Sequence, residues 1–130
     1  MGYLLDTNVL IDLVQGDEKL PTVQSRFGDV GYLSVISTVE LHAGALVSGR
    51  LDAEMTRRIA EIIDSLIELP FTSSEAQTYA GVIEAIGFSR RMIIDRMIAV
   101  TALTNNLTLL TANSRDFRNI PGLRMEDWSN

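Results

Sequence analysis

The chain opens with an apolar run that passes into a stretch with helical spacing. Tyr3–Leu5 is continuously apolar, and further apolar residues then recur at the spacing of one helix face. These positions are Val9, Leu10, Leu13 and Val14. A continuous apolar run followed by a helical period is typical of a buried parallel strand that leads into a helix. The sequence therefore predicts a first strand, and a first helix over about residues 8–15 that ends at Gly16.

The alternation of strand and helix patterns continues along the rest of the chain. Further strands are predicted at about residues 32–36, 66–70, 107–111 and 123–125, and further helices at about 22–27, 37–48, 53–65, 72–87 and 94–105. The last of these helices has almost no polar side and should be buried in the middle of the fold. Strands that alternate with helices predict a three-layer α/β/α sandwich around a short, mainly parallel sheet. We expect a single domain that spans residues 1–130.

Capping signals precede three of the predicted helices. Ser37 and Glu40, like Thr72 and Glu75, have the spacing of a capping box. In such a box, the side chains of the N-cap residue and of the residue three positions later bind two backbone N–H groups. Asp52 has the side chain and the position to cap the helix that follows it. We therefore expect the helix predicted at about residues 37–48 to begin at Ser37.

Composition excludes several kinds of site. Without cysteine the chain has no disulfide, thiolate metal site or cysteine nucleophile, and with one histidine it has no multi-histidine zinc site. That histidine, His42, lies two residues from Glu40 and so faces another side of the helix, at the surface or at a partner contact. The absence of a signal-peptide pattern and of a membrane-length apolar run predicts a cytosolic protein.

The charged residues favour local rather than general contacts with anions. The net charge of −6 argues against a broad basic surface for nucleic acid. All the basic residues except Lys19 are arginine, which binds phosphate through two parallel hydrogen bonds. Two local groups stand out: Arg90, Arg91 and Arg96, and then Arg115 and Arg118. The alternative is that each of them is an ordinary solvated surface charge.

Four acidic residues occupy related positions in the predicted fold. Asp6 ends the first strand, Glu40 lies in the first turn of a helix after the second strand, Asp95 begins the buried helix, and Asp116 follows a later strand. In a right-handed α/β fold, strand ends and the helix starts that follow them share one edge of the sheet, so all four can face a common cleft. Each acid also has a purely local explanation, as a helix cap, a capping-box member, a helix-dipole partner or a turn residue.

A cluster of carboxylates is stabilised by a bound cation. Four carboxylates in one cleft would repel one another and raise one another's pKa values, and a hard divalent cation removes that penalty. Mg²⁺ prefers oxygen ligands and often bridges carboxylates to phosphate. The acids therefore favour Mg²⁺ or Mn²⁺ and phosphodiester chemistry. Arg90, Arg91 and Arg115, which flank Asp95 and Asp116, are candidates for contact with substrate phosphate.

Five segments, in order along the chain, resemble the motifs of one known family. They read LDTNVLID from Leu5, STVEL from Ser37, DRMIA from Asp95, LTANSRDF from Leu110 and IPGL from Ile120. Together they resemble the motifs of PIN-domain ribonucleases, and specifically of VapC-type toxins of bacterial toxin–antitoxin pairs. The resemblance covers nearly the whole chain. Before the third acid, residues 87–94 are more basic than the family's usual segment.

The resemblance implies a PIN-like fold, an activity and a partner. The activity is that of an endoribonuclease in which one or two Mg²⁺ or Mn²⁺ ions activate the water that cleaves a structured cellular RNA. The catalytic residues and metal ligands would be Asp6, Glu40, Asp95 and Asp116. The residues that orient them would be Thr7, Asn8, Thr111 and Asn113. The resemblance further implies a cognate antitoxin, a toxin homodimer and a larger toxin–antitoxin assembly. We expect an antitoxin segment near residues 9–14 and 41–63, with a basic side chain that reaches the acids.

Other functions fit the sequence less well. A phosphatase with a strand-end Asp nucleophile usually needs a second Asp at position 8, where this chain has Asn8, and a lysine in the cleft. No Gly-x-Gly-x-x-Gly motif follows the first strand, so a dinucleotide site is unsupported. The serious alternative is a PIN-like fold kept for protein binding without catalysis. The presence of an acid at all four positions argues against that alternative.

Overall fold

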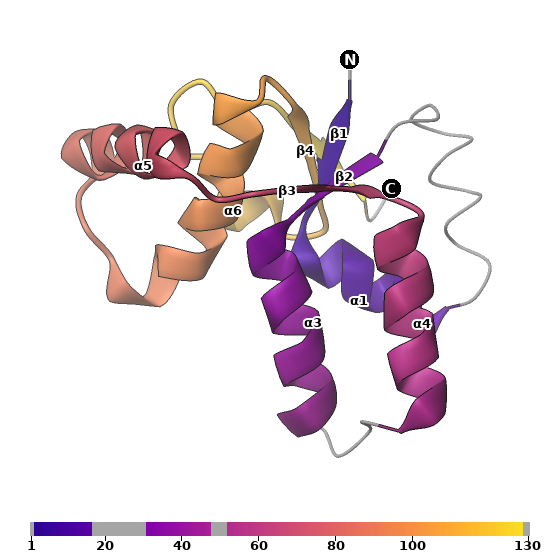
Figure 1. Cartoon of the computed structure of the whole chain (residues 1–130). Coiled ribbons are helices and arrows are strands. Elements are labelled where there is room, and N and C mark those ends of the chain that lie inside the picture. Colours follow the sequence, from indigo (N-terminus) through magenta and orange to yellow (C-terminus); the bar gives the residue numbers. More distant parts are fainter. Residues whose placement is uncertain (1, 17–30, 48–51, 129–130) are drawn as a thin grey trace.

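One parallel sheet runs through the part of the chain that the computed structural model describes, which is residues 2–16, 31–47 and 52–128 (Figure 1). The strands are β1 (Tyr3–Leu5), β2 (Gly31–Ser34), β3 (Ile67–Leu69), β4 (Thr108–Thr111) and β5 (Met125–Asp127). Their order in the sheet is β3-β2-β1-β4-β5, and each neighbouring pair is parallel. The sheet predicted from the sequence is therefore confirmed, with β1 at its centre.

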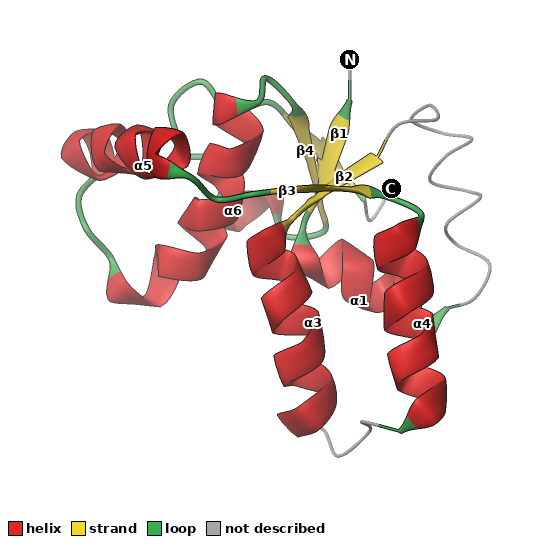
Figure 2. Cartoon of the chain, viewed as in Figure 1, coloured by secondary structure: helices red, strands yellow, loops and turns green. Residues whose placement is uncertain are grey.

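Helices cover both faces of the sheet (Figure 2). On one face lie α1 (Thr7–Gln15), α3 (Val35–Val47) and α4 (Ala53–Asp64), which pack against one another. On the other face α5 (Ser73–Ile86) packs against α6 (Ile93–Thr104). Two short 3₁₀ turns complete the described elements: η1 (Arg90–Met92) leads into α6, and η2 (Ser114–Asp116) follows β4. These layers confirm the predicted α/β/α sandwich.

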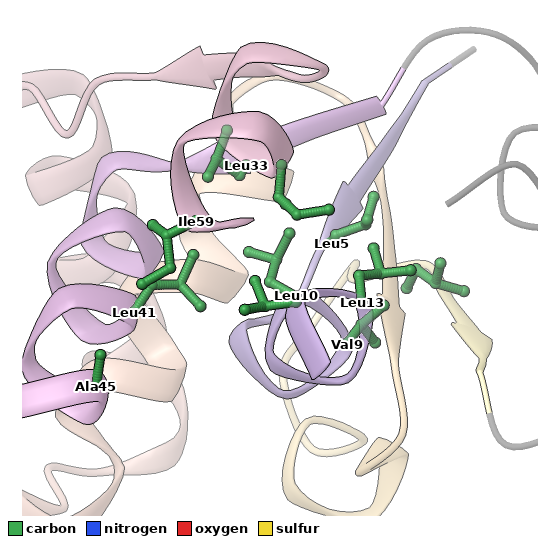
Figure 3. Packing of buried hydrophobic residues seen from close by; sticks show 11 residues of the cluster. Leu5, Val9, Leu10, Leu13, Leu33, Leu41, Ala45 and Ile59 are labelled. Carbon is green, nitrogen blue, oxygen red and sulfur yellow. The ribbon is translucent and has the colours of Figure 1, made fainter. Parts of the chain in front are cut away.

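The two helical layers meet the sheet through alternate residues of the same strands. Leu5 and Leu110 are fully buried in the core formed with α1, α3 and α4, part of which Figure 3 shows. Leu4 and Leu109 are fully buried in the core formed with α5 and α6. Successive side chains of a strand point to opposite faces, so one continuous apolar run supplies both cores. This is why β1 is apolar throughout and why two successive residues of β4, Leu109 and Leu110, are both leucine.

Two of the predicted helix starts are confirmed by their hydrogen bonds. Thr72 and Glu75 form a capping box, in which the Thr72 N–H donates to Glu75 Oε1 at 2.7 Å. Asp52 caps α4, because its Oδ1 accepts a hydrogen bond from the Met55 N–H at 2.8 Å. The side chains at these two positions therefore fix where α5 and α4 begin.

The capping box predicted at Ser37 is wrong, because α3 begins at Val35. The helix follows β2 directly, and Ser34 Oγ accepts a hydrogen bond from the Ile36 N–H at 3.0 Å. Ser34 thus supplies the first side-chain acceptor, ahead of the predicted helix start. Ser37 and Glu40 are then free to make contacts outside their own helix.

The last strand and the predicted loop before α6 differ in detail from the sequence-based expectation. β5 begins at Met125, the residue level with Leu109 in β4, because a turn with positive φ at Gly122 precedes it. The segment predicted as a loop at 88–94 contains η1 and the first residues of α6. The short helix predicted at 22–27 lies outside the described residues. Among the described helices, none has both the length and the apolar character needed to span a bilayer.

Candidate active site

Asp6 stands where β1 ends and α1 begins, and its side chain is almost fully buried. Its Oδ1 accepts a hydrogen bond from the Thr7 N–H at 2.8 Å, and its Oδ2 accepts one from Thr111 Oγ1 at 2.8 Å. Its backbone N–H donates to the Leu110 carbonyl at 2.9 Å. Asp6 is therefore both a helix cap and a strand-end acid. The neighbouring strand β4 holds its carboxylate in place.

Glu40 reaches the same edge of the sheet from the second turn of α3. Thr7 Oγ1 donates a hydrogen bond to Glu40 Oε1 at 2.6 Å and lies 2.8 Å from Ser37 Oγ. Because the one hydroxyl proton of Thr7 goes to the carboxylate, Ser37 is the donor to Thr7. The chain Ser37–Thr7–Glu40 thus ties α3 to the start of α1 and fixes one oxygen of the carboxylate.

Ser37 is a site residue that the sequence analysis missed. It is fully buried, whereas the sequence analysis placed it at a helix cap. A signal was present in the sequence, since Ser37, Leu41 and Ala45 recur every four residues along the buried side of α3. A serine on the apolar side of a helix needs a hydrogen-bond partner there, and the Thr7 hydroxyl is that partner.

Three of the four predicted acids line one hollow of about 400 Å³. Asp6 comes from the end of β1, Glu40 from α3, and the partly buried Asp95 from the first turn of α6. Thr7 and Asn8 line the same hollow. We call this space the acidic hollow. It lies at the carboxyl edge of the parallel sheet, where ligands bind in open α/β folds.

Asp116, the fourth predicted acid, is in η2 and is not among the residues that line the acidic hollow. It lines two neighbouring hollows instead. Its negative charge nevertheless raises the pKa of Asp95, so the two carboxylates lie within electrostatic reach of each other. The turn of η2 after β4 therefore places Asp116 beside the other acids and outside the space that they share.

Burial and repulsion between like charges raise the pKa values of two acids of the hollow, Asp6 and Asp95. Burial raises the pKa of Asp6 from 3.8 to about 6, and the charges of Asp95 and Glu40 add to this effect. The hydrogen bonds from Thr111 and from the Thr7 N–H act in the opposite direction. Burial also raises the pKa of Asp95, as do the charges of Asp116 and Glu40, while Arg91 lowers it.

The donor chemistry of the hollow suits a hard divalent cation. Its charged donors are carboxylates, and burial together with neighbouring negative charges raises the pKa values of Asp6 and Asp95, a cost that a bound cation would relieve. In the described part of the chain, however, no three or more His, Cys, Asp or Glu side chains are grouped closely enough to hold a metal ion by themselves. Mg²⁺ keeps several water ligands and needs only one or two carboxylates, so the residues present fit such an ion.

The residues predicted to orient the acids of the site differ in whether their side chains contact those acids. Thr7 binds Glu40, and Thr111 binds Asp6. The Asn113 N–H donates to Thr111 Oγ1 at 3.0 Å, while the exposed Asn113 side chain lines a neighbouring hollow.

The basic residues also differ in their burial and in the hollows that they line. Arg91 and Arg115 line the same hollow as Asp116, and the exposed Arg90 does not line it. Arg96 is not a surface charge: it is buried on α6 and donates to the Gly87 carbonyl at 2.8 Å. His42 is exposed, as expected.

Comparison with known proteins identifies the class and then the relatives of this chain. A family model described as the PIN domain matches residues 3–123, so the chain belongs to the PIN-domain family. It is homologous to VapC ribonucleases: it is 37% identical to Ribonuclease VapC1 of Rickettsia felis, over 96% of this chain and 95% of that protein. It is 32% identical to the tRNA(fMet)-specific endonuclease VapC of Shigella flexneri, over 99% of both chains.

A solved structure shares the fold. The chain matches a toxin–antitoxin complex from Klebsiella pneumoniae with a TM-score of 0.69 and 26% identity, over 93% of this chain and 94% of that one. The resemblance found in the sequence is therefore confirmed, and the homologues of this chain are ribonucleases.

Proposed function

We propose that this protein is a Mg²⁺- or Mn²⁺-dependent endoribonuclease and the toxin of a VapBC-type toxin–antitoxin pair. The observation that carries the proposal is the convergence of Asp6, Glu40 and Asp95 on one hollow at the carboxyl edge of the sheet. Two of these carboxylates are desolvated and crowded by like charges, a costly arrangement that a bound cation relieves. The homology to VapC ribonucleases supports the same conclusion.

The chain's own residues prepare the site for hydrolysis of a phosphodiester. One or two of the carboxylates of Asp6, Glu40 and Asp95 would hold the cation, and Asp116, the fourth predicted ligand, would act on it from the neighbouring hollow. When bound, the cation would neutralise charge on the phosphate and lower the pKa of water. Thr111 and the Thr7 N–H keep the Asp6 carboxylate in one orientation, and Thr7 does the same for Glu40. Asp6 and Asp95 have raised pKa values and are the candidates for taking the proton of the attacking water.

The substrate in this proposal is a structured cellular RNA. One relative is by name a tRNA(fMet)-specific endonuclease, which makes tRNA the first substrate to test. The test compares cleavage of total tRNA in Mg²⁺ and in EDTA by the wild type, Asp6→Asn and Asp95→Asn. Glu84→Gln, an exposed acid on α5, is the matched control.

We expect the wild type and Glu84→Gln to cleave RNA and to gain thermal stability with Mg²⁺ by ligand linkage. Both responses should be lost in Asp6→Asn and Asp95→Asn. Unchanged metal stabilisation in these two variants would show that the proposed metal site is wrong. Partner binding by a wild type that cleaves no RNA would favour the alternative, a catalytically silent binding module.

An apolar groove next to the acidic hollow suits the antitoxin. This groove of about 150 Å³ lies between α1, α3 and α4 and is lined mainly by Ile11, Val14, Leu41, Ala45, Met55 and Ile59. Ile11, Glu40 and Gly44 line both the groove and the acidic hollow, so the two spaces are continuous. We propose that an antitoxin segment places apolar side chains in the groove and a basic side chain among the acids. The related toxin–antitoxin complex supports such a partner.

The antitoxin contact has an electrostatic test. If a basic side chain of the antitoxin binds the acids, the double variant Asp6→Asn/Asp116→Asn should bind the antitoxin more weakly than the wild type does at low salt. The difference should shrink in part at high salt, because salt screens the more accessible Asp116 more strongly than the buried Asp6. Equal affinities at both salt concentrations would mean that inhibition is steric. A cytosolic location, a toxin homodimer and a larger assembly with the antitoxin remain predictions of this proposal.

A further inference from the structure

A second hollow, of about 380 Å³, lies beside the acids and is rich in arginine. Its charged lining is Arg91, Arg96, Arg115, Arg118 and Asp116. These residues come from three separate segments: η1, the first turns of α6, and η2 with the residues just after it. We call this space the arginine hollow. Four positive charges against one negative charge is unexpected in a chain whose net charge is −6.

The guanidinium groups of the arginine hollow are of two kinds. Arg96 is buried and fixed by its hydrogen bond to the Gly87 carbonyl, so it forms a rigid part of the wall. Arg91, Arg115 and Arg118 are exposed, and within the described residues they make no hydrogen bond or ion pair. Each therefore presents a set of N–H donors without a protein acceptor, in the planar arrangement that matches a phosphate.

Other arginines on the described surface are bound by the protein itself, with the exception of the exposed Arg90. Arg57 on α4 pairs with Glu54 and Glu61, and Arg124 donates to Asn106. The three unpaired arginines of the hollow thus contrast with arginines that the fold itself satisfies. The contrast points to a ligand outside the chain, and the charge and geometry of the donors point to an anion with several oxygens.

The arginine hollow is electrostatically connected to the acidic hollow. Asp116 lines the arginine hollow and acts on Asp95, which lines the acidic one. Arg91 also lines the arginine hollow, and its positive charge acts on the same Asp95 carboxylate. If a cation at the acids binds one phosphate of a polyanion, the arginine hollow offers a positive site close by for another phosphate of the same strand.

We propose that the arginine hollow is a phosphate subsite, in which Arg91, Arg115 and Arg118 bind a backbone phosphate of an RNA strand next to the phosphate at the acids. The inference rests on the proposed function and deepens it by naming where the strand is held. It adds Arg118 to the arginines expected from the sequence and leaves out Arg90, which does not line the hollow. Phosphate contacts fix the position of a strand and do not read its bases.

The first test measures RNA binding without cleavage. The probes are fluorescein-labelled decamers of uridylate and of adenylate, and binding is followed by fluorescence anisotropy in EDTA over a range of salt concentrations. The proteins are the wild type, Arg91→Ala, Arg115→Ala and Arg118→Ala. Arg57→Ala is the control, because it removes one positive charge at an exposed position on α4.

Each variant of the arginine hollow should lower the slope of log affinity against log salt by about 0.7 for the lost phosphate contact. The loss should be the same for both decamers, and Arg57→Ala should leave the slope unchanged. Unchanged slopes in all three hollow variants would overturn the proposal. An equal loss in Arg57→Ala would also overturn it, since the effect would then be one of net charge.

An RNA analogue with a neutral backbone tests whether the ligand of the arginine hollow is an RNA strand or a free anion. A uridylate decamer with methylphosphonate linkages should bind the wild type and Arg118→Ala equally, because it offers no charged phosphate. Displacement of the charged decamer by millimolar inorganic phosphate at constant ionic strength, with no effect of the linkage chemistry, would show a free-phosphate site and overturn the assignment to RNA.

RNA cleavage assays in Mg²⁺ distinguish a failure of this inference from a failure of the proposed function. If both hold, Arg118→Ala should raise KM roughly tenfold, the effect of one charge-assisted contact, with little change in kcat. If the wild type cleaves RNA and Arg118→Ala has the same KM, the arginine subsite is refuted and the ribonuclease function stands. If no RNA is cleaved but the salt slopes change as expected, the subsite stands and the ribonuclease function is refuted.

Discussion

Replacing Asp6 by asparagine should make the metal-free protein more stable at neutral pH. Burial raises the pKa of Asp6 from 3.8 to about 6, so the folded state holds the proton of this group more tightly than the unfolded state. The stability that comes from the protonated form is complete below about pH 4 and is lost as the pH rises through 6. This difference in pKa corresponds to about 3 kcal/mol. An asparagine side chain would keep the shape of the carboxyl group and would not ionise.

The expected change in the free energy of unfolding depends on which hydrogen bonds of Asp6 an asparagine can replace. Its carbonyl oxygen can accept the hydrogen bond from the Thr7 N–H, and its amide can donate to Thr111 Oγ1, which reverses the direction of the wild-type bond. Both contacts become neutral and somewhat weaker. We therefore expect Asp6→Asn to raise the free energy of unfolding by about 2 kcal/mol above pH 7 and to have little effect near pH 4.

The assay is urea unfolding in EDTA across this pH range, for the wild type, Asp6→Asn and the control Glu84→Gln. The wild type and the control should lose stability as the pH rises from about 4 to about 7, and Asp6→Asn should lose much less. Added Mg²⁺ should restore the stability of the wild type at neutral pH. The same pH dependence in Asp6→Asn as in the wild type would refute the reasoning, since the raised pKa would then belong to another group.

Two further predictions concern hydrogen bonds of the fold and the site. Thr72→Ala removes the capping box of α5 and should lower the free energy of unfolding by about 1 kcal/mol in urea titrations, without a change in cleavage rate. Ser37→Ala removes the donor to Thr7 and loosens Glu40, so calorimetric titration should show weaker Mn²⁺ binding. Unaltered Mn²⁺ affinity in Ser37→Ala would limit the role of Ser37 to packing.

Much of the fold could be predicted because local patterns and long-range packing agree. The apolar runs around Leu4 and Leu109 mark strands that are buried on both faces, and helical spacing marks what lies between them. The capping boxes show the limit of such patterns. The spacing at Ser37 and Glu40 matches that at Thr72 and Glu75, but only the second pair caps a helix. The difference arises because α3 already begins at Val35, so Ser37 lies inside the helix and binds Thr7, which is distant in the sequence.

The candidate site was predictable in its acids and less so in its surroundings. Topology places Asp6, Glu40 and Asp95 at one edge of the sheet, as the order of strands and helices suggests. Whether Asp116 shares their hollow depends on the path of η2, which the sequence does not determine. The arginines behave likewise: Arg90 and Arg96 look alike in the sequence, but the fold turns one outward and buries the other.

The central position of β1 has a consequence for the timing of synthesis. Asp6 and Thr111, which share a hydrogen bond, lie 105 positions apart along the chain, and β4 pairs directly with β1. A ribosome that adds about 5–20 residues per second makes them roughly 5–20 s apart. During that interval the growing chain contains Asp6 but lacks β4, whose Thr111 donates a hydrogen bond to the Asp6 carboxylate. Translation that stops before β4 therefore yields a fragment without an assembled site.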